Sequence, residues 1–117
     1  MMKYEGGCHC GKVRFEVEMD LGPVLECNCS HCAKKGFLLA FAPAEAFTQT
    51  SGGPGDTREY LFNTHKIHHQ FCTTCGTEPF SRGEAPNGVK MAAINVRCID
   101  GVDLDALKRQ PYNGAGA

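Results

Sequence analysis

The chain lacks any long apolar run and any cluster of basic residues. No segment has 18 consecutive apolar residues, and the N-terminal residues 1–7 lack the apolar core of an export signal. We therefore expect no membrane partner and no secretion, which leaves the cytoplasm as the expected location. The net charge is only -1, from 12 basic and 13 acidic side chains, and no basic stretch would follow a phosphate backbone. Nucleic acid is therefore not expected as a partner.

Cysteine, in contrast, is abundant and strongly clustered. Seven of the eight cysteines lie in three short segments, residues 8–10, 27–32 and 72–75. In a reducing compartment this spacing favours metal binding over disulfide bonds. A structural zinc ion often takes four thiolates, whereas a catalytic zinc ion keeps three protein ligands and one open position. Seven thiolates therefore divide naturally into a closed site of four and an open site of three.

Apolar and polar residues alternate from Lys12 to Met19, which predicts a half-buried strand directly after the first cluster. The other expected elements, in chain order, are a buried strand over 36–42, a helical turn over 43–47, a loop over 51–56, β-prone runs over 58–63 and 66–71, an edge strand over 77–81, a turn at Asn87-Gly88, a strand over 89–97 and helical turns over 103–109. The edge position follows from Pro79, which cannot donate a backbone hydrogen bond. We therefore expect one mostly β domain over residues 1–117, with antiparallel sheets, one or two short helical turns and a loose tail over 110–117.

The closed site is predicted to join the first and third clusters. Cys72 and Cys75, followed by Gly76, are typical of a zinc knuckle, in which glycine allows a positive φ and backbone amides point toward sulfur. Cys8 and Cys10 form a second hook, so we assign these four cysteines to a structural zinc ion. A redox dithiol at Cys72 and Cys75 is the alternative, but such motifs usually begin a helix in a βαβ unit. Iron is a further alternative, because it also accepts four thiolates.

The open site is predicted at Cys27, Cys29 and Cys32, which lie close enough in sequence for one loop to surround an ion. Three candidates exist for the fourth position: an exchangeable ligand, which we prefer, His31, or Cys98. The alternative for Cys98 is a small buried hydrophobic residue. A metal ion deprotonates a coordinating thiol, so a visiting thiol such as glutathione would be activated as a thiolate at the open position.

Other side chains near the clusters admit two interpretations each. Lys34 and Lys35 either attract carboxylates toward the open site or are solvated surface lysines. His69 lies on the same face of its predicted strand as Ile67 and Phe71, so we expect it to point inward. There it would hydrogen bond a sulfur, pack against the core or act as a general acid.

The ordered clusters resemble those of the family that contains glutathione-dependent formaldehyde-activating enzymes and centromere protein V. The matching segments are Gly6 to Phe15, Cys27 to Cys32, Phe71 to Gly76 and Asn95 to Arg97, and the chain is similar to the short members of the family. The resemblance implies a β-tent fold, a structural zinc ion on Cys8, Cys10, Cys72 and Cys75, and a zinc ion linked to catalysis on Cys27, Cys29 and Cys32. Ligand counting leads to the same division.

The resemblance also implies a reaction, the condensation of formaldehyde with glutathione to S-(hydroxymethyl)glutathione, which is classed with carbon–sulfur lyases. We therefore expect an enzyme with two zinc ions per chain, the second only partly retained, and with a thiol and a small aldehyde as partners. The alternative is a zinc-stabilised binding module without catalysis. That alternative predicts an occupied fourth position, with His31 as the candidate ligand.

Overall fold

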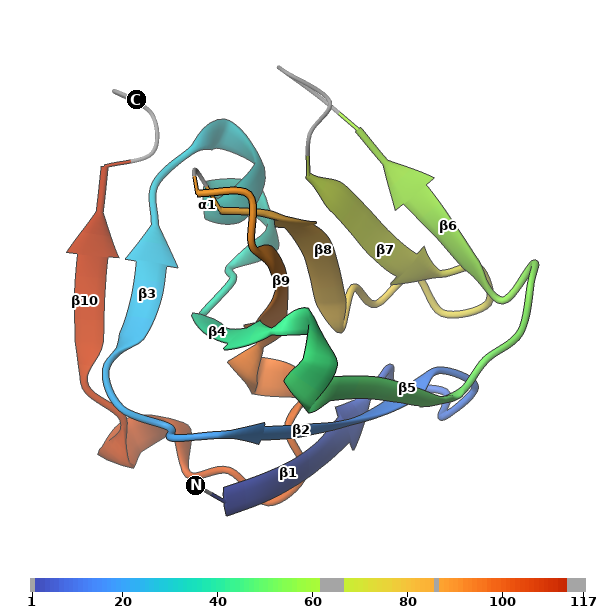
Figure 1. Cartoon of the computed structure of the whole chain (residues 1–117), viewed down its shortest axis with the longest axis horizontal. Helices are drawn as coiled ribbons and strands as arrows, with labels where there is room; N and C mark the ends of the chain where they lie inside the picture. The colour runs from blue at the N-terminus through green and yellow to red at the C-terminus, as the bar shows by residue number, and fades with distance from the viewer. Residues whose placement is uncertain (1, 62–66, 86, 114–117) are drawn as a thin grey trace.

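The computed structural model describes residues 2–61, 67–85 and 87–113, and in these residues two β-sheets dominate (Figure 1). The smaller sheet has the order β1-β2-β5 and consists of β1 (Met2–Gly7), β2 (Arg14–Met19) and β5 (Phe47–Ser51). The larger sheet has the order β10-β3-β4-β9-β8-β7-β6 and consists of β3 (Val24–Cys27), β4 (Leu39–Pro43), β6 (Thr57–Tyr60), β7 (His68–Cys72), β8 (Phe80–Glu84), β9 (Lys90–Asn95) and β10 (Arg109–Tyr112). The mostly β fold predicted from the sequence is confirmed.

The described helices are short and lie between strands. They are α1 (Ser30–Lys35) and the 3-10 helices η1 (Ala44–Ala46), η2 (Val96–Cys98) and η3 (Leu104–Ala106). None of them is long and apolar enough to cross a membrane. The helical turns expected over 43–47 and 103–109 correspond to η1 and η3, whereas α1 was not predicted.

The core lies between the two sheets, which Figure 1 shows with β1, β2 and β5 running below the strands of the larger sheet. Phe15 of β2 stacks on Phe47 of β5 at a centroid distance of 5.7 Å, and Phe80 of β8 meets the same two rings at 6.1 and 4.8 Å. Burying one such side chain contributes about 1.5–3 kcal/mol. These three rings therefore join the smaller sheet to the larger one.

The alternation after the first cluster does form a strand, and its apolar face is buried. Phe15, Val17 and Met19 are buried in β2, while Glu18 is exposed. The strand begins at Arg14 because the preceding residues form a tight turn, closed by a hydrogen bond of 3.0 Å from the amide of Cys8 to the carbonyl of Val13. This turn carries the first cysteine cluster.

The edge position expected for the segment around Pro79 is wrong. Pro79 precedes β8, and β8 pairs with β7 on one side and β9 on the other. Because proline lies outside the strand, its missing amide removes no ladder hydrogen bond. The predicted hairpin is confirmed, since β8 and β9 are antiparallel and Gly88 has a φ of 84° in the intervening turn.

The C-terminal segment also differs from expectation. In place of a loose tail from residue 110, β10 continues to Tyr112 and pairs in parallel with β3. The other strand pairs in the described residues are antiparallel. The strand expected over 36–42 begins only at Leu39, although Phe37 and Leu38 are already buried. The break expected near Asn63 and Thr64, and the tail from residue 114, lie outside the described residues.

Candidate metal centres

The structure brings the first and third cysteine clusters together. Cys8 and Cys10 lie in the turn between β1 and β2, Cys72 is the last residue of β7, and Cys75 lies in the turn that follows. Their four Sγ atoms lie within 4.8 Å of one another, with Cys10 Sγ 3.6 Å from both Cys8 Sγ and Cys72 Sγ. Sulfurs bound to a tetrahedral zinc ion at 2.3 Å are about 3.8 Å apart. This group of four sulfurs therefore has the spacing and chemistry that fit such an ion.

Backbone amides point at these sulfurs, as the knuckle prediction requires. The amide of Val13 donates to Cys8 Sγ at 3.3 Å, and the amide of Thr74 donates to Cys72 Sγ at 3.4 Å. Gly76 has a φ of 77° and donates its amide to the carbonyl of Cys72 at 2.9 Å. Such donors stabilise negative charge on sulfur, and the backbone amide of Cys75 lowers the pKa of Cys72. The turn is thus arranged for thiolates.

Negative charge on four such close sulfurs requires a counter-ion. A hydrogen bond with the side chain of Thr77 lowers the pKa of Cys75 to about 5. At Cys10 the backbone amide of Lys12 acts in the same direction, but burial and the neighbouring thiols outweigh it and raise the pKa to about 11. Like charges at this separation repel each other strongly, so four thiolates need a bound cation.

The arrangement around Cys72 and Cys75 differs from that of a redox dithiol. The segment from Cys72 to β8 is described without interruption, and it contains a turn but no helix after Cys75. Redox Cys-x-x-Cys motifs obtain their reactivity from a helix N-terminus. The local fold therefore favours the metal interpretation of this pair.

The structure also brings the three cysteines of the middle cluster together. Cys27 is the last residue of β3, Cys29 is the N-cap of α1, and Cys32 lies within α1 with its side chain buried. Their Sγ atoms lie within 4.8 Å of one another. The amide of Cys32 donates to Cys29 Sγ at 3.3 Å, and the amide of Cys29 donates to Cys27 Sγ at 3.5 Å. The loop and the first turn of α1 therefore surround a common point.

The three thiols differ in acidity. Burial acts to raise the pKa of Cys29, but the hydrogen bonds that it accepts, first from the amide of Cys32, outweigh burial and lower it. Burial raises the pKa of Cys32 well above its ordinary value. Full ionisation of this group of three sulfurs therefore also requires a cation.

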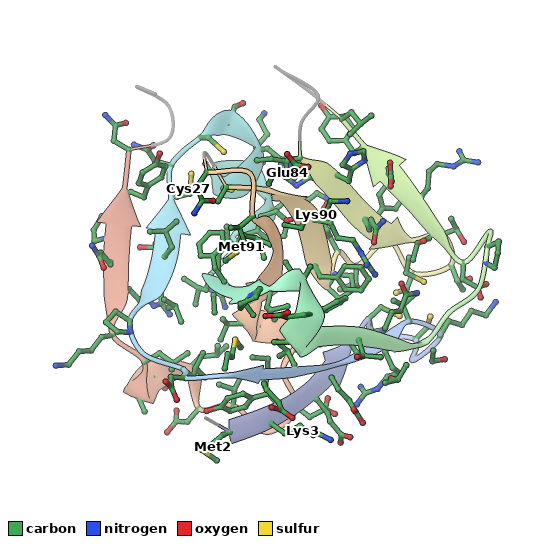
Figure 2. All side chains as sticks on the ribbon, viewed as in Figure 1. Met2, Lys3, Cys27, Glu84, Lys90 and Met91 are labelled. Carbon is green, nitrogen blue, oxygen red and sulfur yellow. The ribbon has the colours of Figure 1, made fainter. Side chains whose placement is uncertain are left out.

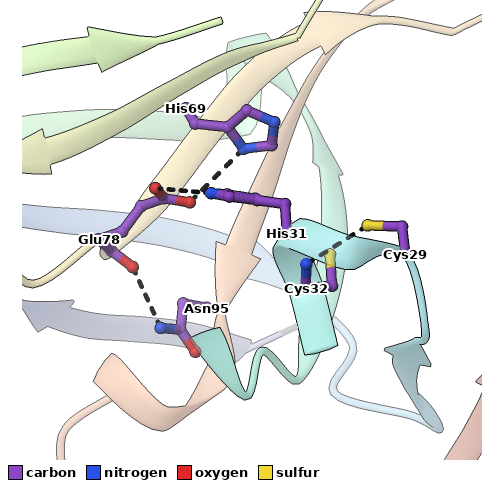
Figure 3. Close-up of polar contacts among 6 residues, drawn as sticks. All are labelled: Cys29, His31, Cys32, His69, Glu78 and Asn95. Carbon is purple, nitrogen blue, oxygen red and sulfur yellow. Dashed lines mark hydrogen bonds and ion pairs between the residues drawn. The ribbon is translucent and has the colours of Figure 1, made fainter. Parts of the chain in front are cut away.

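Neither candidate for a fourth protein ligand joins this group in the described residues. His31 converges with His69 and Glu78 instead, and Figure 3 shows its ring directed away from Cys29 and Cys32. Cys98 lies in η2, packs against the core and belongs to neither sulfur group. Burial raises the pKa of Cys98 to about 11, so its thiol is neutral at pH 7. This environment matches the interpretation of Cys98 as a packing residue.

Two clefts lie on opposite sides of α1. The first, of about 550 Å³, is the thiol-side cleft, and its lining includes Cys27, Cys32, Arg97 and Tyr112. Figure 2 shows Cys27 at the end of β3, far from Met2 and Lys3 at the start of β1. The second, of about 500 Å³, is the histidine-side cleft, and its lining includes His31, Lys34, Lys35, Tyr60 and Glu78. The two lysines therefore line the cleft that the sulfurs do not.

Arg97 and Glu78 were not predicted as site residues, although Arg97 lies in one of the matching segments. Arg97 lines the thiol-side cleft, where its Nε donates to the carbonyl of Gly36 at 2.9 Å. Glu78 is only 5% exposed, and it meets the inward-pointing His69 that the strand pattern predicted. The available signal for Glu78 was an acidic residue directly before Pro79 and Phe80, in a segment with no other charge between Cys75 and Ser81.

Comparison with known protein families decides the relationship. The sequence model described as glutathione-dependent formaldehyde-activating enzyme matches residues 3–111. The chain belongs to this family. A crystal structure of a Rhodobacter sphaeroides protein, solved in a structural-genomics project, has 27% sequence identity and a TM-score of 0.77, and the match covers 91% of this chain and 99% of that one. This chain is thus a member of the formaldehyde-activating family, and its two sulfur groups lie on a fold that is also found in a solved structure.

Proposed function

We propose that this protein condenses a small aldehyde such as formaldehyde with glutathione, as a carbon–sulfur lyase of the S-(hydroxymethyl)glutathione synthase type. The observation that carries the proposal is the group of three sulfurs, Cys27, Cys29 and Cys32, beside the thiol-side cleft, with no fourth protein ligand in the described residues. Family membership supports glutathione and formaldehyde as the substrates. The reducing cytoplasm, which holds glutathione, is the compartment that suits this chemistry.

We assign zinc to both sulfur groups, because thiolate ligands favour it and the sulfur spacing of the four-cysteine group suits a tetrahedral ion. Cys8, Cys10, Cys72 and Cys75 would hold a structural ion that ties β1 and β2 to β7. Cys27, Cys29 and Cys32 would hold a second ion that is lost more readily. When bound there, zinc would supply the positive charge that keeps an incoming thiol ionised at neutral pH.

The side chains of the thiol-side cleft provide the means to orient glutathione. Glutathione carries two carboxylates, and the guanidinium of Arg97 is the group in the cleft suited to bind one of them. The hydrogen bond from Arg97 Nε to the carbonyl of Gly36 holds the guanidinium in place. The backbone amide of Asn28 donates to the backbone carbonyl of Tyr112 at 3.1 Å. This hydrogen bond holds the end of β10, which lines the cleft, next to the cysteine loop. Arg97 would thus position the substrate thiol near the three sulfurs.

The reaction needs neither an oxidant nor a reductant. The thiol of glutathione loses its proton, and the resulting sulfur lone pair forms a bond to the aldehyde carbon. The π electrons of the carbonyl move to oxygen, which takes up a proton and becomes the hydroxyl of the product. Holding the two reactants together lowers the entropic cost of this addition.

The test is a thermal shift measured on zinc-loaded protein with glutathione at millimolar concentration. Glutathione should raise the melting temperature, and S-methylglutathione, which has no free thiol, should not. Cys29→Ser should abolish the shift while the protein stays folded. Arg97→Gln should lower the affinity for glutathione by about tenfold, and the shift at a given glutathione concentration should become smaller. Equal shifts with glutathione and S-methylglutathione, or no shift with glutathione, would support the binding module instead.

A further inference from the structure

A third group of metal-ligating side chains converges on the side of α1 opposite the sulfurs. His31 comes from α1, His69 from β7 and Glu78 from the segment before β8 (Figure 3). One donor atom from each residue lies within 4.8 Å of the other two. His31 Nε2 is 3.8 Å from Glu78 Oε1, and His69 Nδ1 is 3.5 Å from Glu78 Oε2. Three separate elements therefore place two imidazoles around one carboxylate.

The group is buried, which makes its charge important. Glu78 is 5% exposed, His69 is 7% exposed and the side chain of His31 is 10% exposed. A carboxylate removed from water loses several kcal/mol of solvation unless a positive charge or strong hydrogen bonds replace the water. A positive charge at this position would therefore stabilise Glu78 in its ionised form.

The distances suit a shared ion better than direct hydrogen bonds. Hydrogen bonds from nitrogen to oxygen are usually about 2.7–3.2 Å long, and both contacts to Glu78 are longer. Nitrogen and oxygen ligands of a tetrahedral zinc ion at 2.0–2.1 Å are about 3.3 Å apart. The observed separations of 3.5 and 3.8 Å are each closer to that spacing than to the most common hydrogen-bond length of about 2.9 Å.

Neighbouring residues hold the three side chains in place. Asn95 Nδ2 donates to the backbone carbonyl of Glu78 at 3.1 Å and thereby fixes the segment that presents the carboxylate. The ring of His31 contacts the rings of Phe37 and Tyr60, at centroid distances of 5.4 Å to each. Supports of this kind orient the ligands of metal sites in proteins.

Solvent can reach the group through the histidine-side cleft, whose lining includes His31 and Glu78. The same cleft is lined by Lys34 and Lys35, whose charges oppose a bare cation and favour an anion that binds beside it. The cleft thus offers both an entry path and room for an exchangeable ligand.

We infer that His31, His69 and Glu78 form a third metal site, which binds one divalent transition-metal ion through two imidazole nitrogens and a carboxylate oxygen. Two histidines and one carboxylate are donors for zinc, iron(II) or cobalt(II), whereas calcium and magnesium prefer sites made of oxygen alone. The site leaves coordination positions open toward the histidine-side cleft. It does not depend on the thiol reaction, because it shares no ligand with either sulfur group.

The test is a Co²⁺ titration of the reduced protein, followed by metal analysis and absorption spectroscopy. Co²⁺ on thiolates absorbs strongly in the near ultraviolet through sulfur-to-metal charge transfer, whereas Co²⁺ on nitrogen and oxygen does not. We expect one equivalent of Co²⁺ that binds without charge-transfer absorption. Glu78→Gln and His69→Gln should each weaken its binding by about 100-fold.

The matched controls are Glu59→Gln and His68→Gln, because these exposed residues form an ion pair with each other at 2.8 Å outside the group. Both control variants should retain the equivalent without charge transfer. The inference fails if the wild-type protein binds no such equivalent, or if Glu78→Gln and His69→Gln bind it as tightly as the controls. The wild-type result alone can overturn the inference, so it remains testable even if a variant does not fold. If the wild-type protein binds no Co²⁺ with charge-transfer absorption, that result would instead count against the assignment of the sulfur groups.

Discussion

Asn95 forms hydrogen bonds with both Glu78 and Arg97, which line the clefts on the two sides of α1. Its replacement should therefore lower the stability of the fold. Its side-chain amide donates to the buried carbonyl of Glu78 at 3.1 Å, and its Oδ1 accepts from the amide of Arg97 at 3.2 Å as the N-cap of η2. Asn95→Ala leaves the Glu78 carbonyl without this donor, which costs about 1–3 kcal/mol. Loss of the cap adds about 0.5–1 kcal/mol. We predict a total loss of about 3 kcal/mol and a melting temperature lower by about 12 °C.

The assay is urea and thermal unfolding followed by circular dichroism, at one saturating zinc concentration for all variants. Asn87→Ala is the matched control, because Asn87 Oδ1 accepts a single exposed hydrogen bond from the amide of Val89. It should cost less than about 1 kcal/mol. If Asn95→Ala destabilises the protein no more than Asn87→Ala does, the described role of the Asn95 hydrogen bonds is wrong.

Two further predictions concern the scaffold. Gly6→Ala should prevent normal packing of β1, because an added Cβ would lie 2.2 Å from the carbonyl oxygen of Cys98, whereas Gly22→Ala meets nothing within 4 Å and should be nearly neutral. Equal melting temperatures for these two variants would contradict this. Hydrogen bonds from Arg14 hold the pKa of Asp100 below its ordinary value in the folded protein. The pair therefore stabilises the folded state at pH values above the pKa of Asp100 in the unfolded chain. This stabilisation is lost as the pH falls through the lower pKa of Asp100 in the folded state. Asp100→Asn should therefore lower stability by less than about 1 kcal/mol at pH 7, with a difference from wild type that disappears at low pH. A difference that is the same at both pH values would disprove the assignment.

Local patterns in the sequence were sufficient to predict the half-buried strand β2 and the β8–β9 hairpin. In β2 the alternation of Phe15, Val17 and Met19 with polar residues directly reflects burial on one face. The cysteine spacing likewise predicted which sulfurs converge, because short loops limit how far Cys27, Cys29 and Cys32 can separate. The convergence of side chains that are close in sequence is thus accessible to this kind of reasoning.

Features that depend on tertiary contacts were not accessible in the same way. Helix α1 has six residues and no apolar stripe, and it is bounded by the N-cap Cys29 and by Gly36 with a φ of 71°. Pro79 suggested an edge strand, but the strand begins after it and lies inside the sheet. Glu78 meets His31 and His69 only because the turn before β8 packs against α1. No local pattern indicates that contact.

The division of seven sulfurs into groups of four and three is tested most directly by counting sulfur-bound Co²⁺ ions per chain in wild type, Cys27→Ser and Cys75→Ser. We predict two such ions in wild type and one in a Cys27→Ser variant that keeps its fold. Cys75→Ser should lower the melting temperature far more, because it would remove one of the four sulfurs proposed to hold an ion between β7 and the β1–β2 turn. A single sulfur-bound ion in wild type, or equal destabilisation by the two variants, would contradict this division.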